Sequence, residues 1–225
     1  MQSEKKGSAK PLAFCKHPFS VAAFDLDGTL LKKNGSFAFC RFLCKKGLLS
    51  RLDLAICALI YLRHCYFGLS LHDLHQQVFD RFFRGVSQAH LQIWIEPFLS
   101  EQLNTLWYSP ALLRLKALQQ EGIECIIFSN SPRFLVQAIA RKIGVEKVFA
   151  TEYQINDKGE LIGIATLMDG LQKAKILQQI ASKTTMALSD SPLDLPFLEA
   201  AKMCVAVNPK RALRKIAQKK GWEIL

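Results

Sequence analysis

The chain has little of what membrane-spanning and secreted proteins require. Its longest unbroken apolar run, residues 54–62, is too short for a helix that crosses a bilayer, which needs roughly 20 residues. The first twenty residues are polar and basic, so we expect no signal peptide. The seven cysteines are odd in number and show no framework spacing, which predicts free, buried thiols in a reducing compartment. The sequence therefore favours a cytoplasmic protein.

Acidic residues are also few. The chain has 30 Lys and Arg against 19 Asp and Glu, and its formal net charge is +11. The basic excess lies in residues 1–50 and 201–225, where it could meet anionic lipid, nucleic acid or a phosphorylated substrate, or form a solvated surface. Hydrophobic residues make up 50% of the chain and charged residues 22%, which excludes a disordered or low-complexity protein.

The apolar pattern divides the chain into two kinds of segment. In residues 36–107 apolar residues recur at helical spacing; glycines 47, 68 and 85 are typical helix ends, and serines 50, 70 and 87 typical helix starts. Pro97 is expected to break or kink the fourth helix. The remainder alternates short buried strands with helices, which favours a parallel sheet with right-handed crossovers. The predicted strands are residues 21–24, 123–128, 148–150, 185–188 and 204–207, with a hairpin of 153–156 and 161–165; the predicted helices begin near residues 109, 131, 171 and 208.

The predicted fold class is α/β, a doubly wound parallel (Rossmann-like) sheet with an inserted all-helical cap. Residues 1–19 form an N-terminal lead-in, residues 20–35 and 108–225 form the core domain, and residues 36–107 form the cap inserted after the first strand.

Polar side chains gather at the predicted carboxyl ends of the strands, where function collects in doubly wound sheets. Four carboxylates and one lysine fall there, and so many carboxylates repel one another unless a cation is present. Mg²⁺ prefers oxygen ligands and joins one or two protein carboxylates to a substrate phosphate. A carboxylate can also attack phosphorus and form an aspartyl-phosphate. The aspartates are Asp25 and Asp27 after the first strand and Asp190 and Asp194 after a later one, and the lysine is Lys173.

The segments FDLDGTL and SDSPLD, together with Ser129 and Lys173, resemble the motifs of the haloacid dehalogenase (HAD) superfamily. The resemblance is closest to its subfamily IB, the phosphoserine-phosphatase-like branch, which carries a helical cap between the first two motifs. It extends from residue 21 to residue 225. It implies an Mg²⁺-dependent phosphomonoesterase that works through an aspartyl-phosphate on a small phosphate ester.

The resemblance also implies a role for each matched residue. Asp25 is the nucleophile and a metal ligand; Asp27 is the acid/base and binds the metal through its backbone carbonyl. Thr29, Ser129, Asn130 and Lys173 form the phosphate-binding group, in which Thr29 supports the loop and Lys173 neutralises charge. Asp190 is a metal ligand, and Asp194 binds the metal or orients its surroundings. Lys173 is chosen over Lys175 because the branch places a leucine four residues after the lysine, here Leu177.

The chain departs from this branch at positions that concern the substrate. Phosphoserine phosphatases have a glutamate where this chain has Asn34, and glycines where it has Asn130-Ser131-Pro132, which disfavours L-phosphoserine as the substrate. The segment Gly35-Ser36-Phe37 and the apolar run after it are similar to the bacterial phosphatidylglycerophosphatase of the C type.

Two other functions therefore stay open beside the leading one. One is a peripheral membrane phosphatase acting on a lipid phosphate at the inner membrane, with Arg41, Lys45, Lys46 and Arg51 facing anionic lipid. The other is a non-catalytic module that binds anionic membrane or nucleic acid. Under the leading hypothesis the partner is a small phosphorylated substrate and no nucleic acid is expected; the sequence does not indicate the oligomeric state.

Two further groups have simpler explanations than a binding site. His72 and His75, three residues apart on a predicted helix, could bind a metal with Cys65, but packing between helices explains them as well. The basic residues of the last helix, from Lys210 to Lys220, are interpreted as a solvated face.

Overall fold

The structure is a computed structural model that describes residues 18–180 and 184–225. Its strands are β1 (Val21–Asp25), β2 (Glu124–Pro132), β3 (Lys147–Ile155), β4 (Leu161–Thr166), β5 (Thr185–Ser189), β6 (Met203–Ala206) and β7 (Glu223–Ile224). Its helices are α1 (Gly35–Lys45), α2 (Arg51–Tyr66), α3 (Leu71–Phe82), α4 (Gln88–Phe98), η1 (Leu99–Leu103), α5 (Asn104–Leu106), α6 (Ser109–Gln120), α7 (Arg133–Lys142), α8 (Gly170–Ile180), η2 (Pro192–Asp194), α9 (Leu195–Glu199) and α10 (Arg211–Lys220).

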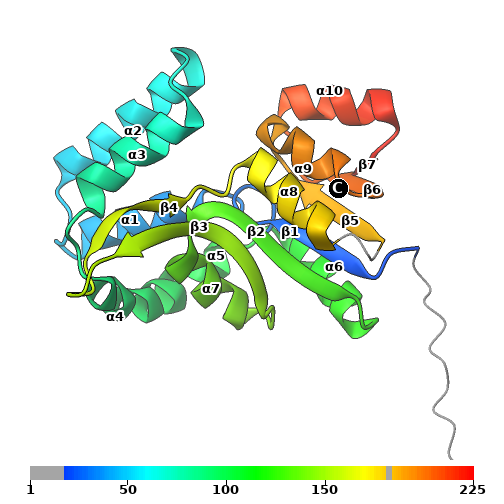
Figure 1. Ribbon diagram of the computed structural model, residues 1–225. Helices are drawn as coiled ribbons and strands as arrows, with labels where there is room; N and C mark the ends of the chain where they lie inside the picture. Colours follow the sequence, from blue (N-terminus) through cyan, green and yellow to red (C-terminus); the bar gives the residue numbers. More distant parts are fainter. Residues whose placement is uncertain (1–17, 181–183) are drawn as a thin grey trace, which may run out of the picture.

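The strands form one sheet in the order β4-β3-β2-β1-β5-β6-β7, in which every neighbouring pair is parallel except β3 and β4. Helices α8, α9 and α10 lie on one face of the sheet, and α6 and α7 lie on the other (Figure 1). Successive residues of β1 alternate between two hydrophobic cores: Ala22 and Phe24 join the first, and Val21 and Ala23 join the second. The predicted doubly wound α/β fold is confirmed.

Helices α1 to α6 lie between β1 and β2 in the chain. The Ser50 and Ser70 hydroxyls each accept a hydrogen bond at 3.0 Å from the backbone N–H three residues on, at Asp53 and Asp73, which satisfies otherwise unpaired N–H groups at the starts of α2 and α3. Ser87 begins α4 without such a bond. Pro97 lies inside α4 and does not end it; the chain continues into the π-helical turn η1.

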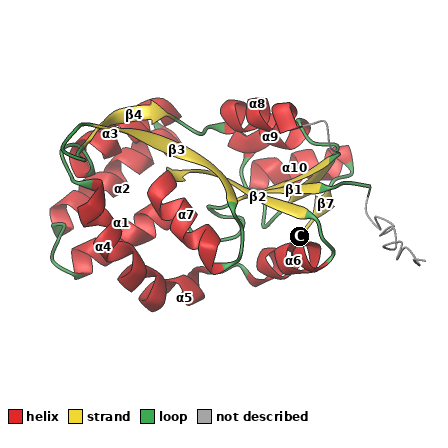
Figure 2. Ribbon diagram, turned by 60° about the horizontal axis from the view of Figure 1, so that its bottom comes forward, coloured by secondary structure: helices red, strands yellow, loops and turns green. Residues whose placement is uncertain are grey.

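One hairpin of the sheet reaches across to the helical block, which the sequence pattern did not indicate. Strand β3 is continuous, and its outer half pairs with β4 beyond the end of β2. The backbone N–H of Gly85 donates to Leu161 O at 2.7 Å, and that of Gln88 donates to Gly159 O at 3.0 Å. Figure 2 shows this hairpin extending over α3 and away from the rest of the sheet. The helical block is therefore anchored to the core by backbone hydrogen bonds as well as by its two chain connections.

Several predicted boundaries are shifted. Strand β2 continues through a bulge to Pro132, so α7 begins at Arg133 rather than at Ser131. Helix α10 begins at Arg211, after Asn208, whose φ of 41° is in the left-handed region. The short strand β7 was not predicted. The helix predicted to begin near residue 171 is expected to run to about residue 182, and this end lies outside the described residues.

The prediction of buried free thiols holds for some cysteines only. Cys40, Cys57 and Cys125 are buried and free, whereas Cys65 is exposed, because it lies on the outer side of α2. Within the described ranges, no helix is both long and apolar enough to cross a membrane.

Candidate active site

The centre of the site is the carboxyl end of β1, which lies between β2 and β5 in the middle of the sheet. Asp25 is the last residue of β1, and its carboxylate is buried. Its Oδ2 accepts a hydrogen bond from Thr29 Oγ1 at 3.0 Å, and its Oδ1 accepts one from Lys173 Nζ at 2.7 Å. The turn after β1 and the helix α8 thus hold this carboxylate from two sides.

Lys173 is fully buried between two carboxylates. Besides Asp25, its ammonium group donates to both oxygens of Asp194, at 2.9 and 3.0 Å. Ser189, the last residue of β5, donates to Asp194 Oδ2 at 2.7 Å. Both oxygens of Asp194 therefore accept hydrogen bonds from Lys173 or Ser189, and Asp194 holds the ammonium group of Lys173 against Asp25.

Asp27 receives hydrogen bonds from two other segments. Its Oδ1 accepts from the backbone N–H of Gly35 at 2.5 Å, and its Oδ2 accepts from Ser129 Oγ at 2.9 Å and Ser131 Oγ at 2.7 Å. Ser36 in turn donates to Ser131 Oγ at 2.6 Å. Sequence reasoning selected Ser129 but missed Ser36 and Ser131. Ser131 could have been found from the sequence, because residues 129 and 131 are two apart and therefore lie on the same side of an extended chain.

Asp190 follows β5 and contacts the turn that contains Asp27. Its Oδ1 is buried and has no hydrogen-bond partner in the described part of the chain. A Cβ on Gly28 would come within 2.5 Å of Asp190 Oδ2, and Gly28 has a φ of +94°, so only glycine fits here. Lys210 Nζ lies 3.5 Å from Asp190 Oδ2. The Lys210 side chain is 57% exposed, as expected for a solvated face, and it also approaches this edge, because the backbone N–H of Lys210 donates to Asp190 O at 3.0 Å.

The electrostatics of the site show an excess of negative charge. Burial raises the pKa of Asp25 well above its ordinary value; Lys173 opposes this shift, and the neighbouring carboxylates of Asp194 and Asp190 add to it. Burial also raises the pKa of Asp190, against the influence of Lys210. Burial alone would lower the pKa of Lys173, but Asp194 and Asp25 outweigh it and raise that pKa, so the lysine is held as an ammonium ion.

These features fit a divalent cation with a preference for oxygen. The buried Oδ1 of Asp190 has no hydrogen-bond partner in the described part of the chain and requires one. The negative charges of the carboxylates around it are not fully balanced by nearby positive charge. The described residues contain no group of three or more His, Cys, Asp or Glu side chains that could hold a metal, and this includes the alternative of His72, His75 and Cys65. Mg²⁺ needs no such cage, because it binds through one or two carboxylates and keeps its other positions for water and phosphate.

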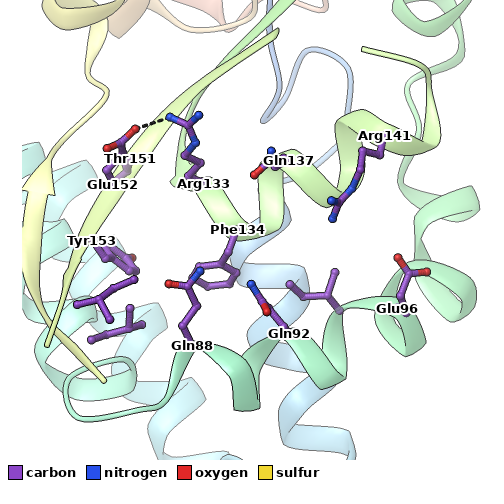
Figure 3. Close-up of a pocket in the computed structure, with 13 residues that line it drawn as sticks. Gln88, Gln92, Glu96, Arg133, Phe134, Gln137, Arg141, Thr151, Glu152 and Tyr153 are labelled. Carbon is purple, nitrogen blue, oxygen red and sulfur yellow. Dashed lines mark hydrogen bonds and ion pairs between the residues drawn. The ribbon is translucent and has the colours of Figure 1, made fainter. Parts of the chain in front are cut away.

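The remaining predicted residue, Asn130, lies in the bulge of β2. Its backbone carbonyl accepts a hydrogen bond from Thr151 Oγ1 at 2.7 Å, and its side chain is half-buried. Thr151 also lines a cavity of about 570 Å³ between α4, α7 and β3 (Figure 3). None of the candidate site residues lines that cavity, and its two arginines and two glutamates balance in charge. The site is therefore defined by its cluster of polar side chains and not by this cavity.

Comparison with known proteins agrees with the fold. Residues 22–199 match the family of haloacid dehalogenase-like hydrolases. A histidinol-phosphatase of Neisseria meningitidis is 25% identical over 92% of this chain and 98% of its own length. The phosphoserine phosphatase SerB1 of Mycobacterium tuberculosis is 26% identical over 91% of this chain and 70% of its own length. A crystal structure of a protein of unknown function from Bordetella pertussis superimposes with a TM-score of 0.81, at 24% identity, over 91% of this chain and 97% of that one.

The fold and the aspartate-rich edge are those of a hydrolase built on a doubly wound sheet. The chain belongs to the haloacid dehalogenase-like hydrolases, and its resemblance to the phosphoserine-phosphatase-like branch is confirmed.

Proposed function

We propose that the protein is an Mg²⁺-dependent phosphomonoesterase that hydrolyses a small phosphate ester through a phosphorylated Asp25. The observation that carries the proposal is the pairing of Asp25 and Asp27 at the end of the central strand. The first is held by Lys173, and the second by the hydroxyls of Ser129 and Ser131. Asp25, Asp190 and the backbone carbonyl of Asp27 would hold the cation, which supplies positive charge for the transferring phosphoryl group. In this proposal residues 36–107 act as the cap.

The first step forms the bond between Asp25 and phosphorus. A carboxylate oxygen of Asp25 attacks the phosphorus atom, the bond from phosphorus to the ester oxygen breaks, and Asp27 gives that oxygen a proton. Lys173 stabilises the charge on the phosphoryl oxygens, and Asp194 and Ser189 keep the lysine in place. Ser129, whose hydroxyl now bonds Asp27, is in position to turn toward the phosphoryl group.

The second step breaks the bond that the first step formed. Asp27 takes a proton from a water molecule, the resulting hydroxide attacks the phosphorus, and Asp25 leaves as a carboxylate. Asp27 must therefore exist in both protonation states. The hydroxyl groups of Ser129 and Ser131 can each donate or accept a hydrogen bond, so they can partner Asp27 with or without its proton.

The test is hydrolysis of p-nitrophenyl phosphate by the purified protein, with Mg²⁺ and with excess EDTA. We expect turnover that requires Mg²⁺ and a phosphoenzyme that can be trapped with labelled substrate. A protein that turns over equally in EDTA would contradict the metal assignment. One that never hydrolyses the ester with Mg²⁺ would contradict the proposed function and favour a non-catalytic module.

A second candidate, a lipid-phosphate phosphatase at a membrane surface, is favoured by the side chains that α2 exposes. Leu52, Leu59 and Leu62 are exposed, and Tyr66 and Phe67 are 76% and 80% exposed at the tip of the α2–α3 hairpin. This hairpin projects from the molecule on the side of the sheet that carries α8, α9 and α10 (Figure 1). Apolar side chains at such a tip suit insertion into the headgroup region of a bilayer.

Co-sedimentation with anionic liposomes tests this candidate. On α2, Ile60 is buried and Ile56 is half-buried, so replacing either of them would damage packing. The exposed pair Tyr66 and Phe67 is the proper target. Under the lipid hypothesis, replacing both with serine abolishes sedimentation and leaves turnover of p-nitrophenyl phosphate unchanged. If the wild-type protein stays in the supernatant at low salt, this candidate fails.

A further inference from the structure

A second cavity, of about 320 Å³, lies between the loop after β1, the first helix α1 and the short helix α5. Four of its lining residues are cations, and none is an aspartate or glutamate. Lys32 and Lys33 come from the loop, and Arg41 and Lys45 lie one turn apart on α1. The apolar part of the lining consists of Phe37, Ala38, Phe42 and Leu106, and the polar remainder of Asn34, Gln102 and Thr105.

The charge in this cavity is not balanced by the protein. Neighbouring Lys46 pairs with Glu101 at 2.7 Å, yet none of the four lining cations pairs with a carboxylate of the described residues. Like charges one helical turn apart repel each other, so Arg41 and Lys45 destabilise α1 unless an anion lies between them. The cavity of Figure 3, in contrast, has as many acidic as basic residues. A concave site with several cations and no acid is complementary to a compact anion with more than one charge.

The cavity also lies where the helical block joins the core. Two chain connections link them, and they pair with each other: Lys32 N donates to Leu106 O, and Tyr108 N donates to Leu30 O, both at 2.8 Å. Lys32 and Leu106, one from each connection, both line the cavity. A ligand here would therefore touch both connections and the first helix of the block at once.

One residue that lines the cavity, Asn34, is adjacent in the chain to the residue that hydrogen-bonds Asp27. Asn34 lines the cavity, and its side chain accepts a hydrogen bond from Phe37 N at 2.8 Å, which caps α1. The next residue, Gly35, donates its backbone N–H to Asp27 at 2.5 Å. Asn34 thus fixes the start of α1 between the cavity and the acid/base residue.

We propose that this cavity is a binding site for a compact, phosphate-bearing polyanion, which bridges the two connections between the helical block and the core. The anion is either a free polyphosphate-type metabolite or the phosphate headgroup of an anionic lipid, since both present the same charged oxygens to lysine and arginine. None of the residues assigned to catalysis lines this cavity, and binding there does not depend on hydrolysis.

The test is binding of tripolyphosphate to the full chain in the presence of EDTA. Calorimetry measures the affinity, and hydrogen–deuterium exchange locates the bound anion. Without a divalent cation the catalytic edge is rich in carboxylates and repels anions, so the cavity is measured by itself. We expect protection of the backbone in residues 31–37 and 102–108. The variant Arg41→Ala with Lys45→Ala should weaken binding by about tenfold or more, and the affinity should fall as salt rises. The matched control is Arg214→Ala with Lys215→Ala, which removes the same charge from the exposed face of α10 and should change the affinity less than about twofold.

A second arm distinguishes the two sources of the anion. In this arm, vesicles containing phosphatidylglycerol replace tripolyphosphate. If only the vesicles protect residues 31–37 and 102–108, the site binds a lipid headgroup. If tripolyphosphate protects them, the site binds a soluble anion. Equal losses in the two double variants would show general attraction to a basic surface and overturn the proposal. Absence of binding by both ligands, or protection confined to other residues, would overturn it as well.

Discussion

Replacement of Lys173 by methionine probes the charge balance of the site directly. Methionine keeps a similar length but removes the positive charge that Asp25 and Asp194 share at 2.7 to 3.0 Å. Both carboxylates stay buried, with side chains that are 5% and 6% exposed. Removing one partner of a buried ion pair typically costs about 3–5 kcal/mol. Since domains are stable by only about 5–15 kcal/mol, the variant should lose a large share of its free energy of unfolding.

The loss should depend on pH in a definite direction. In the wild-type protein the pKa of Asp25 lies above its ordinary value of 3.8. Stability linked to this group is therefore complete below about pH 3.8, and it is lost as the pH rises through the higher pKa of the folded state. Without Lys173, which opposes the shift, the pKa of Asp25 rises further. We expect the difference in unfolding free energy between wild type and variant to grow as the pH rises from 5 to 8, because Asp25 then loses its proton and its charge is no longer balanced by Lys173.

Urea unfolding at several pH values measures this difference, and Lys175→Met is the control. Lys175 lies on the same helix, two residues on, and is exposed, so its replacement should change stability by less than about 0.5 kcal/mol at any pH. Added Mg²⁺ should restore part of the loss in the Lys173 variant, because a cation bound only by the folded state stabilises it. Equal effects of the two replacements, or a loss that stays constant from pH 5 to pH 8, would refute this account of the site.

The other predictions concern the aspartate edge. Asp25→Asn should lower turnover of p-nitrophenyl phosphate by about three orders of magnitude with the fold intact, because it removes the attacking charge; residual activity above a tenth of wild type would exclude Asp25 as nucleophile. Asp27→Asn should let phosphoenzyme accumulate with an activated ester, as rapid-quench trapping would show, and equal losses on activated and unactivated esters would count against its acid/base role. Asp190→Ala should raise the Mg²⁺ concentration needed for half-maximal activity steeply, which a titration tests. Gly28→Ala should do likewise and lower the melting temperature, since its Cβ would collide with the Asp190 carboxylate; unchanged values would contradict the close contact of 2.5 Å.

The sequence by itself determined the alternation of strands and helices and the order of the candidate residues along them. Strand β1 is a run of small and apolar residues bounded by Asp25, and serines 50 and 70 begin α2 and α3 as local hydrogen-bonding rules require. These features depend on contacts between residues close in the chain. Because parallel strands end at one edge of a sheet, the same local reasoning placed Asp25, Asp190 and Ser129 near one another.

Tertiary structure decided everything that depends on contacts between distant segments. The hydrogen bond from Ser131 to Asp27 joins residues 104 apart in the chain, and the ion pair of Lys210 with Asp190 arises because β6 pairs with β5, which brings the segment after β6 beside the end of β5. The gathering of Lys32 and Lys33 with Arg41 and Lys45 around one cavity likewise needs the two connections to pair at Lys32 and Leu106. Periodicity reports which side of its own element a residue occupies, but not which distant element packs against that side, because packing is fixed by the whole chain folding at once.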